Sequence, residues 1–224
     1  MILQCWQFDE LSNLQTEEAI VNLLNIDSLP PDLKKAVKIK KLVGEQKLFW
    51  QGNSASFFFV VQTGRFKVIR FSNPNHGILL NFAKAGDCLG ETALFSEVYS
   101  CTAISEITSE VIIYPKTLLL SSLHDYPVLF ENLIKMLIKK NHHLKFRLEL
   151  QNIRSAHQRL LKYLHYLARS NNSKVITFDQ PLKEIAAELG FTPETLSRAL
   201  LRLEAEGLIT RSKNTITLQK FFVA

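Results

Sequence analysis

The sequence predicts an α+β fold in which a β-rich N-terminal part, one long helix and a small helical C-terminal part follow one another over 224 residues. Three observations predict it. Short apolar runs alternate with turn residues over residues 36–116, no Gly or Pro interrupts residues 128–171, and two short helical stretches flank Gly190. We therefore expect domains at 1–122, 123–154 and 155–224.

Composition excludes several classes of protein. Hydrophobic residues make up 46% and charged residues 21%, which are globular proportions. No apolar run approaches the roughly 20 residues of a bilayer span, and Met1–Glu10 lacks the basic start of a secretory signal. Three widely separated cysteines favour reduced thiols over a disulfide framework. We expect a cytoplasmic protein that does not bind a membrane.

The N-terminal part begins with a helix predicted over Glu17–Ile26 and ended by Leu29-Pro30-Pro31. From Ala36 to Lys116, runs rich in Phe, Val and Ile alternate with turns such as Thr63-Gly64-Arg65. Short strands punctuated this often are typical of an antiparallel barrel or sandwich.

The long central segment carries a heptad pattern. The expected dimer-helix residues are Phe130, Ile134, Leu137, Asn141, Leu144 and Leu148. A polar Asn at a central a position favours two parallel strands in fixed register, which predicts a homodimer. The alternative is a helix packed on its own domain with a chance heptad. A break is expected near Asn152–Ser155, followed by a second amphipathic helix with Leu160 and Leu164 on one face.

The last third has the spacing of a winged helix-turn-helix. A strand is predicted over Lys174–Phe178 and a helix from Pro181 to Leu189, with Gly190 in the turn. Thr192 is placed to cap a second helix that Pro193 starts and that continues to about Glu206. Two strands around residues 212–214 would form the wing.

The second helix presents one outward patch. Leu196, Leu200 and Leu203 share a face, which leaves Glu194, Ser197 and Arg198 together on the other side at i, i+3 and i+4. In this motif the N-terminal half of that helix enters the major groove, where Arg pairs with guanine and Glu accepts from cytosine. The alternative is a plain Glu194–Arg198 surface pair.

Charge supports an anionic partner, most simply double-stranded DNA. Residues 155–224 hold ten Lys and Arg against six Asp and Glu. A solvated basic surface would give the same numbers. Candidate phosphate contacts, each with solvated surface as its alternative, are Thr192, Thr195, Lys183, Arg202, Arg211 and Lys213.

These motifs resemble the CRP/FNR family of bacterial transcription regulators over nearly the full length. The segments that carry the resemblance are Glu184–Gly190, Glu194–Arg198, Leu48–Ser56, Gly64–Val68 and Ala85–Phe95. The last three are similar to the glycines and phosphate-binding cassette of cyclic-nucleotide-binding β-rolls. The resemblance implies a homodimer with an N-terminal β-roll (jelly roll) for an effector, a long central dimerisation helix and a C-terminal winged helix-turn-helix.

Within the family, Glu194 with Ser197 and Arg198 resembles the FNR/DNR type, which implies palindromic half-sites close to TTGAT. Regulators of the cyclic-AMP type carry Arg where this chain has Pro193, which cannot reach a base. We expect Arg198 to contact the G of each half-site and Glu194 the opposed strand. A regulator of this kind is also expected to contact RNA polymerase.

The effector pocket implied by the resemblance comprises Gly90, Glu91, Thr92, Ala93, Tyr99 and Ser100. Gly90-Glu91 matches the ribose element, but Tyr99-Ser100 stands where cyclic-AMP binders have Arg-Ser, so the bidentate phosphate donor is lost. Leu144-Lys145 takes the place of the hydroxyl pair that contacts adenine. We therefore do not expect cyclic AMP to bind.

Other effectors stay open. Three cysteines cannot supply the four thiolates of an iron–sulfur cluster. Haem would need a histidine, and His76 lies where a haem-sensing relative carries its axial ligand, with His124, His142 and His143 as further candidates. Another small molecule, a redox signal at Cys88, or no effector are the remaining possibilities.

No enzyme motif is present: the sequence has no P-loop, Rossmann glycines, catalytic-triad context or zinc spacing. The leading hypothesis is a sequence-specific DNA-binding transcription regulator. The alternative is a small-ligand sensor that acts through a protein partner and whose helix-turn-helix is vestigial.

Overall fold

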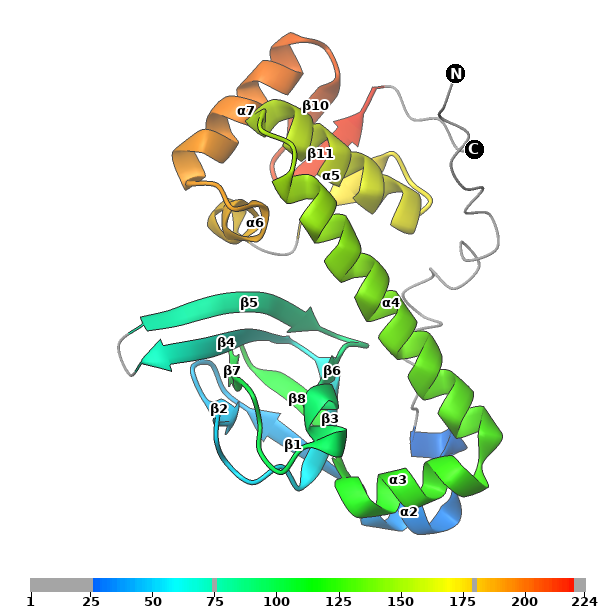
Figure 1. The fold of residues 1–224 in the computed structure, drawn as a ribbon. Coiled ribbons are helices and arrows are strands. Elements are labelled where there is room, and N and C mark those ends of the chain that lie inside the picture. The colour runs from blue at the N-terminus through cyan, green and yellow to red at the C-terminus, as the bar shows by residue number, and fades with distance from the viewer. Residues whose placement is uncertain (1–25, 74–75, 179–180, 220–224) are drawn as a thin grey trace, which may run out of the picture. The chain divides into compact units, whose positions relative to one another are not determined.

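The computed structural model describes residues 26–73, 76–178 and 181–219 (Figure 1). The chain divides into two compact units, and the boundary within the described residues falls between Lys140 and Asn141 in the sequence. We call the described residues up to Lys140 the N-terminal unit and those from Asn141 the C-terminal unit. In the described part of the chain, no helix is both long enough and apolar enough to cross a bilayer.

The N-terminal unit is built on two four-stranded antiparallel sheets. The first sheet has the order β1 (Lys38–Leu42), β8 (Ser109–Pro115), β3 (Phe57–Thr63) and β6 (Cys88–Leu89). The second has the order β2 (Lys47–Phe49), β7 (Thr102–Ser105), β4 (Arg65–Asn73) and β5 (His76–Lys84). The strand and turn pattern predicts an antiparallel barrel or sandwich, and the structure has the sandwich.

Strand β3 explains why its sequence is a continuous apolar run. Phe59 and Val61 belong to the core shared with the second sheet, whereas Phe58 and Val60 belong to a second core under the helices of this unit. A strand buried on both faces needs apolar residues at every position. Residues 58–61 are accordingly all buried.

The helices of this unit are η2 (Ile26–Ser28), α2 (Pro31–Ala36), η3 (Glu91–Phe95), α3 (Lys116–Asp125) and α4 (Pro127–Gln151), which continues into the C-terminal unit. A helix at residues 31–36 was not expected from the sequence. Pro31 begins α2, because its fixed φ suits the first helical position and its missing N–H has no helical partner there. The helix predicted over Glu17–Ile26 lies outside the described residues.

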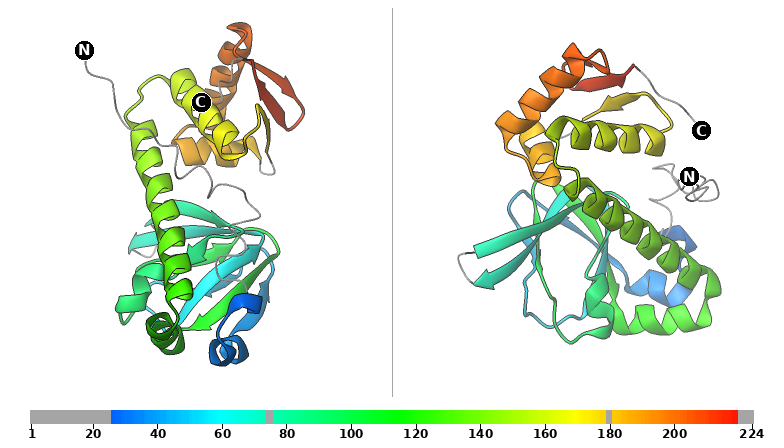
Figure 2. Two further views of the ribbon diagram at one scale, coloured as in Figure 1. Left: turned by 90° about the vertical axis from the view of Figure 1, so that its right-hand side faces the viewer. Right: turned by 45° about the horizontal axis from the view of Figure 1, so that its top comes forward.

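The C-terminal unit follows the predicted order of elements (Figure 2). It contains α5 (Ala156–Ser170), β9 (Val175–Thr177), α6 (Leu182–Leu189), α7 (Pro193–Ala205), β10 (Ile209–Ser212) and β11 (Thr215–Leu218). The three strands form one antiparallel sheet in the order β10-β11-β9. Leu160, Leu164, Ile185, Leu196 and Leu203 are fully or almost fully buried in its core.

The predicted break after the long helix is present, since α4 ends at Gln151 and α5 begins at Ala156. Arg159 fixes this connection. Its guanidinium donates to the carbonyl of Ile153 at 2.7 and 3.0 Å and to the carbonyl of Leu189 at 2.9 Å. One side chain therefore ties the connection to the C-terminal end of α6.

Candidate DNA interface and effector cassette

The turn between α6 and α7 is formed by backbone geometry that the sequence specifies. Gly190 has φ +67°, a left-handed conformation that ends α6. Phe191 N–H then donates to the carbonyl of Ala186 at 2.8 Å. Thr192 caps α7, because its Oγ1 accepts from the N–H of Thr195 at 3.2 Å, and Pro193 takes the first helical position.

Helix α7 has one buried and one open face. Leu196, Ala199, Leu200 and Leu203 are at most 4% exposed and face the core of the C-terminal unit. The base-contact candidates lie on the opposite face and are all exposed: Glu194, Ser197 and Arg198. The packing thus leaves these three side chains free of the core, at the N-terminal half of the helix.

The alternative of a Glu194–Arg198 ion pair is not what the structure has. In the described part of the chain, no carboxylate lies within 4.0 Å of the Arg198 guanidinium. Glu194 is held instead at the start of the helix: hydrogen bonds from its own backbone N–H and from Thr192 lower the pKa of its carboxyl. Glu194 is therefore an anionic acceptor. Arg198 attracts it without an ion-pair contact, and no carboxylate of the described residues occupies the Arg198 guanidinium.

The four charged phosphate candidates fall into two groups. Lys183 and Lys213 are exposed, the latter in the hairpin turn with φ +50°. Arg202 pairs with Glu206 at 2.8 Å and Arg211 with Glu204 at 2.9 Å.

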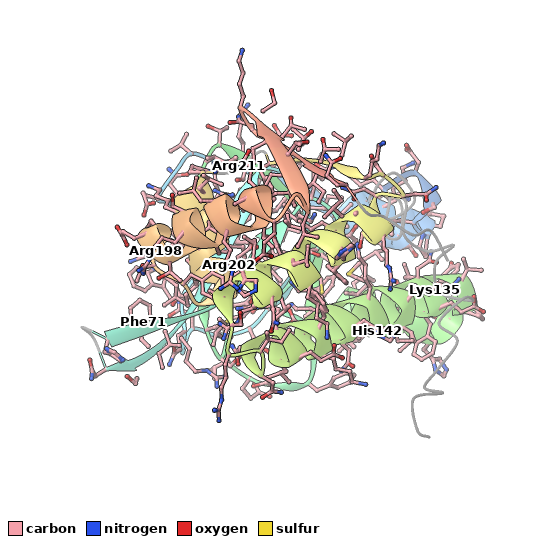
Figure 3. All side chains as sticks on the ribbon, turned by 90° about the horizontal axis from the view of Figure 1, so that it is seen from above. Phe71, Lys135, His142, Arg198, Arg202 and Arg211 are labelled. Carbon is pink, nitrogen blue, oxygen red and sulfur yellow. The ribbon has the colours of Figure 1, made fainter. Side chains whose placement is uncertain are left out.

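Figure 3 labels Arg198 and Arg202 on α7 and Arg211 on the hairpin strand β10. Exposed ion pairs of the kind that Arg202 and Arg211 make contribute little, so they can be exchanged for a phosphate at small cost. Thr192 and Thr195 contact each other through their hydroxyls at 3.1 Å as part of the cap.

The cassette in the N-terminal unit centres on η3. Gly90, with φ +79°, precedes this turn, and Ala93 in it is buried. Tyr99 is 4% exposed: its ring stacks on Phe49 at 4.1 Å between centroids and its hydroxyl donates to the carbonyl of Phe57 at 2.8 Å. Tyr99, which the resemblance aligns with an arginine of cyclic-AMP binders, thus belongs to the core.

The carboxylate of Glu91 already has a cation. Lys140, near the middle of α4, places its Nζ 2.5 Å from Glu91 Oε1 and donates to the carbonyl of Cys88 at 3.3 Å. Burial alone would lower the pKa of Lys140, but the acidic groups of Cys88 and Glu91 outweigh it and the pKa is raised. Beside this pair, the hydroxyls of Thr92 and Ser100 lie 3.2 Å apart. Sequence reasoning missed Lys140, because nothing in the local pattern around it marks a charged contact 49 residues away.

The thiols of this region are not activated. Burial raises the pKa of Cys88 to about 12 and also raises that of Cys101. A nucleophilic or redox-sensing cysteine needs a lowered pKa and access to solvent. Among the described residues, no three His, Cys, Asp or Glu side chains cluster as metal ligands would, and Cys5 lies outside them.

Helix α4 carries a stripe of apolar residues that the described part of the chain leaves exposed. Leu129, Leu133 and Met136 are buried in the N-terminal unit. The predicted heptad residues lie elsewhere on the helix and, apart from the partly buried Leu137, are exposed: Phe130 (50%), Ile134 (37%), Asn141, Leu144 (43%) and Leu148 (62%). Ile138, which the heptad did not include, is 43% exposed as well.

Comparison with known proteins matches both parts of the chain. Residues 39–126 match the model of the cyclic nucleotide-binding domain, and residues 158–221 match that of the Crp-like helix-turn-helix domain. The chain is 24% identical over 206 residues to the anaerobic regulatory protein of Haemophilus influenzae, covering 88% of this chain and 78% of the relative. It is also 24% identical over 174 residues to the cyclic AMP receptor protein of Thermus thermophilus, covering 77% and 80%.

A solved structure agrees on the fold. A variant of CooA from Carboxydothermus hydrogenoformans superposes with a TM-score of 0.72 at 18% identity, covering 89% of this chain and 92% of that one. Along the sequence, one matched domain precedes α4 and the other follows it, in the order that the sequence predicts. The chain belongs to the CRP/FNR family of transcription regulators, with a cyclic-nucleotide-binding-type N-terminal domain and a DNA-binding helix-turn-helix.

Proposed function

We propose that this regulator acts as a homodimer on inverted TTGAT-like half-sites, with Arg198 on the guanine, Glu194 on the opposed strand and Ser197 beside them. The observation that carries the proposal is the open face of α7, where Arg198 has no carboxylate partner among the described residues. An unpaired Arg fork is the side chain best suited to guanine O6 and N7. We further propose the division 1–122, 123–154 and 155–224 as its effector, dimer and DNA domains, and RNA polymerase as a partner.

Binding to a fluorescent TTGAT palindrome tests base contact. Arg198→Ala is expected to cost about 1–3 kcal/mol per contacted base pair and to abolish the preference for G over A at that position. Arg169→Ala, which removes one exposed charge from α5 of the same unit, is the matched control and should keep that preference. Unchanged discrimination in Arg198→Ala would contradict the proposal.

Phosphate contacts are tested by salt rather than by sequence. Lys183→Ala and Lys213→Ala should weaken binding to specific and unrelated duplexes alike, and each should reduce the salt slope by about one. A change in base preference in either variant would contradict the assignment of these lysines to the phosphates.

The dimer is proposed to form through the exposed stripe on α4, with the two copies parallel. Two such stripes would cover each other, and paired Asn141 side chains would fix the register. Sedimentation should show a dimer for the wild-type chain and a much weaker one for Leu144→Ser with Leu148→Ser. Lys145→Ser, on the same helix, is the control. A monomeric wild-type chain, or a double variant as tightly associated as the control, would contradict the proposal.

We also propose that the cassette does not take cyclic AMP. Glu91, the residue that would bind the ribose hydroxyl, is neutralised by Lys140, and Tyr99 fills the place of the phosphate-binding arginine from within the core. Displacing the ammonium of Lys140 from Glu91 would cost the ligand part of its binding energy. Isothermal titration calorimetry should therefore detect no heat of binding for cyclic AMP at micromolar concentrations. A dissociation constant in the micromolar range would refute the proposal.

A further inference from the structure

A cavity in the N-terminal unit is lined by residues of both sheets and by none of the cassette residues 90–93, Tyr99 and Ser100. Its volume is about 380 Å³, within the range of small-molecule sites. We call it the end pocket. Its lining residues are Ala36, Lys38, Lys40, Leu48, Phe57, Phe59, Ile113 and Pro115.

Strand register explains how the end pocket forms. Lys38 lies opposite Ile113, which lies opposite Phe59, so the three occupy one row across the first sheet. Side chains two residues apart on a strand share a face, which adds Lys40 and Phe57 to the same surface. Leu48 closes the opposite wall from β2 of the second sheet. The body of the pocket is therefore apolar and aromatic.

Lys38 and Lys40 are exposed, but they lie on the strand face that turns towards the core further along β1. Further along the same face of β1, Leu42 is 1% exposed and packs in the core between the sheets. Lys38 and Lys40 occupy the two preceding inward positions, and in the described part of the chain neither has a carboxylate within ion-pair distance. Lys41, which points to the other face, does pair with Glu110 at 3.7 Å.

Protection of an exposed edge offers a simpler reason for inward lysines, since β1 is an edge strand and inward charges discourage edge-to-edge pairing. That reason accounts for the charges but not for the cavity beside them. Two unpaired ammonium groups at the mouth of an aromatic cavity attract an anion with an apolar body.

Two lining residues of the end pocket, Phe57 and Phe59, contact Tyr99 of the cassette. The hydroxyl of Tyr99 donates a hydrogen bond to the carbonyl of Phe57 at 2.8 Å and accepts one from the N–H of Phe57 at 3.2 Å. The ring of Phe59 lies 6.3 Å from that of Tyr99 between centroids. Yet neither Glu91 nor Tyr99 lines the pocket, so a ligand there would not use the cassette's polar groups.

We propose that the end pocket is a binding site for a small organic anion. A carboxylate or sulfonate would lie between Lys38 and Lys40, and an aromatic or branched apolar body would enter against Phe57, Phe59 and Ile113. The inference does not depend on DNA binding, and its test requires none.

The probe is 2-naphthoate, with its uncharged isostere 2-naphthamide as the matched ligand, titrated into the full-length chain by calorimetry. Wild-type protein should bind one naphthoate per chain, and at least about tenfold more tightly than the amide. Lys38→Gln with Lys40→Gln should lose that advantage while binding the amide as before. The control variant, Lys35→Gln with Lys41→Gln, removes two charges from exposed positions outside the pocket lining and should bind naphthoate like the wild type.

A second variant tests the cavity itself. Ala36→Trp leaves both lysines in place and fills the space beside them, so naphthoate binding should fall at least about tenfold while the melting temperature shows that the chain is folded. The proposal is overturned if naphthoate does not bind at millimolar concentration. It is equally overturned if the Lys35→Gln, Lys41→Gln control loses as much affinity for naphthoate as the Lys38→Gln, Lys40→Gln variant. A folded Ala36→Trp variant that binds naphthoate as tightly as the wild type would overturn it as well.

Discussion

Replacing Lys140 by Met tests whether the contact between α4 and the cassette stabilises the N-terminal unit. The two side chains of the Lys140–Glu91 pair are each 22% exposed and their charged atoms lie 2.5 Å apart. At an effective dielectric constant of about 20, two charges 4 Å apart attract by about 4 kcal/mol, and partial desolvation offsets much of this. Met fills most of the volume of the Lys side chain but leaves a half-buried carboxylate and the Cys88 carbonyl without their donor. We expect a loss of about 2–3 kcal/mol, below the 3–5 kcal/mol of a fully buried pair.

The same helix supplies the control. Lys135 pairs with Glu131 at 3.7 Å, with side chains 43% and 65% exposed, so Lys135→Met should cost at most about 0.5 kcal/mol. Urea unfolding is followed by tryptophan fluorescence with Trp6 replaced by Phe, which leaves Trp50 as the reporter within the N-terminal unit. Equal losses in the two variants would refute the reasoning.

A double-mutant cycle and pH separate the charge contact from packing. Adding Glu91→Gln to Lys140→Met should recover part of the loss, because no unpaired carboxylate is then left behind. The raised pKa of Lys140 means that its contribution is complete below the ordinary value of 10.5 and is lost as pH rises through the folded value. The gap between the wild type and Lys140→Met should therefore narrow only in strong alkali. A gap that closes between pH 6 and 8 would contradict this assignment.

Two further predictions concern the same unit. Gly64→Ala should lower the free energy of unfolding by at least about 3 kcal/mol, because φ is +83° and the added Cβ would lie 2.6 Å from the Cα of Ser109. Gly52→Ala, with φ +86° and no atom within 4 Å of the added Cβ, should lower it by about 1–2 kcal/mol. Urea unfolding compares the two variants, and equal losses would contradict the steric argument. Folding raises the pKa of Cys88 from 9.0 to about 12, so its thiol stabilises the fold fully below pH 9 and progressively less as pH rises towards 12. With the other two cysteines replaced by Ser, iodoacetamide at pH 8.5 should modify unfolded chains at least about a hundredfold faster than folded ones, and comparable rates would contradict this.

Local chemistry made much of the C-terminal unit predictable. The left-handed turn needs Gly190, the cap needs the Thr192 hydroxyl, and the first helical position suits Pro193, so three adjacent signals agree on one boundary. The spacing of the apolar residues along the helix then fixes which side of α7 is exposed. Base-contact candidates could be chosen because orientation on a helix follows from spacing alone.

Pro31 shows where such signals become ambiguous. Proline is equally compatible with following one helix and with starting the next, and the sequence around residues 29–31 does not distinguish the two. The structure does, because Leu33 of α2 packs into the core under the helices of the N-terminal unit. Tertiary burial, which no local pattern contains, decides the boundary.

Contacts between distant segments were the least predictable features, and both candidate ligand regions depend on them. Glu91 and Lys140 are separated by 49 residues in the sequence. Lys38 and Phe59 lie in one row across the first sheet only because its strand order is β1-β8-β3. The alternation of side chains along a strand identifies its two faces without saying which one turns inward. The sequence alone therefore leaves Lys38 and Lys40 as ordinary solvated charges. The register assigns them to the inner face, beside aromatic residues and away from Glu110. Both lysines are exposed, so solvation alone would also account for them, and the naphthoate titration decides between solvation and anion binding.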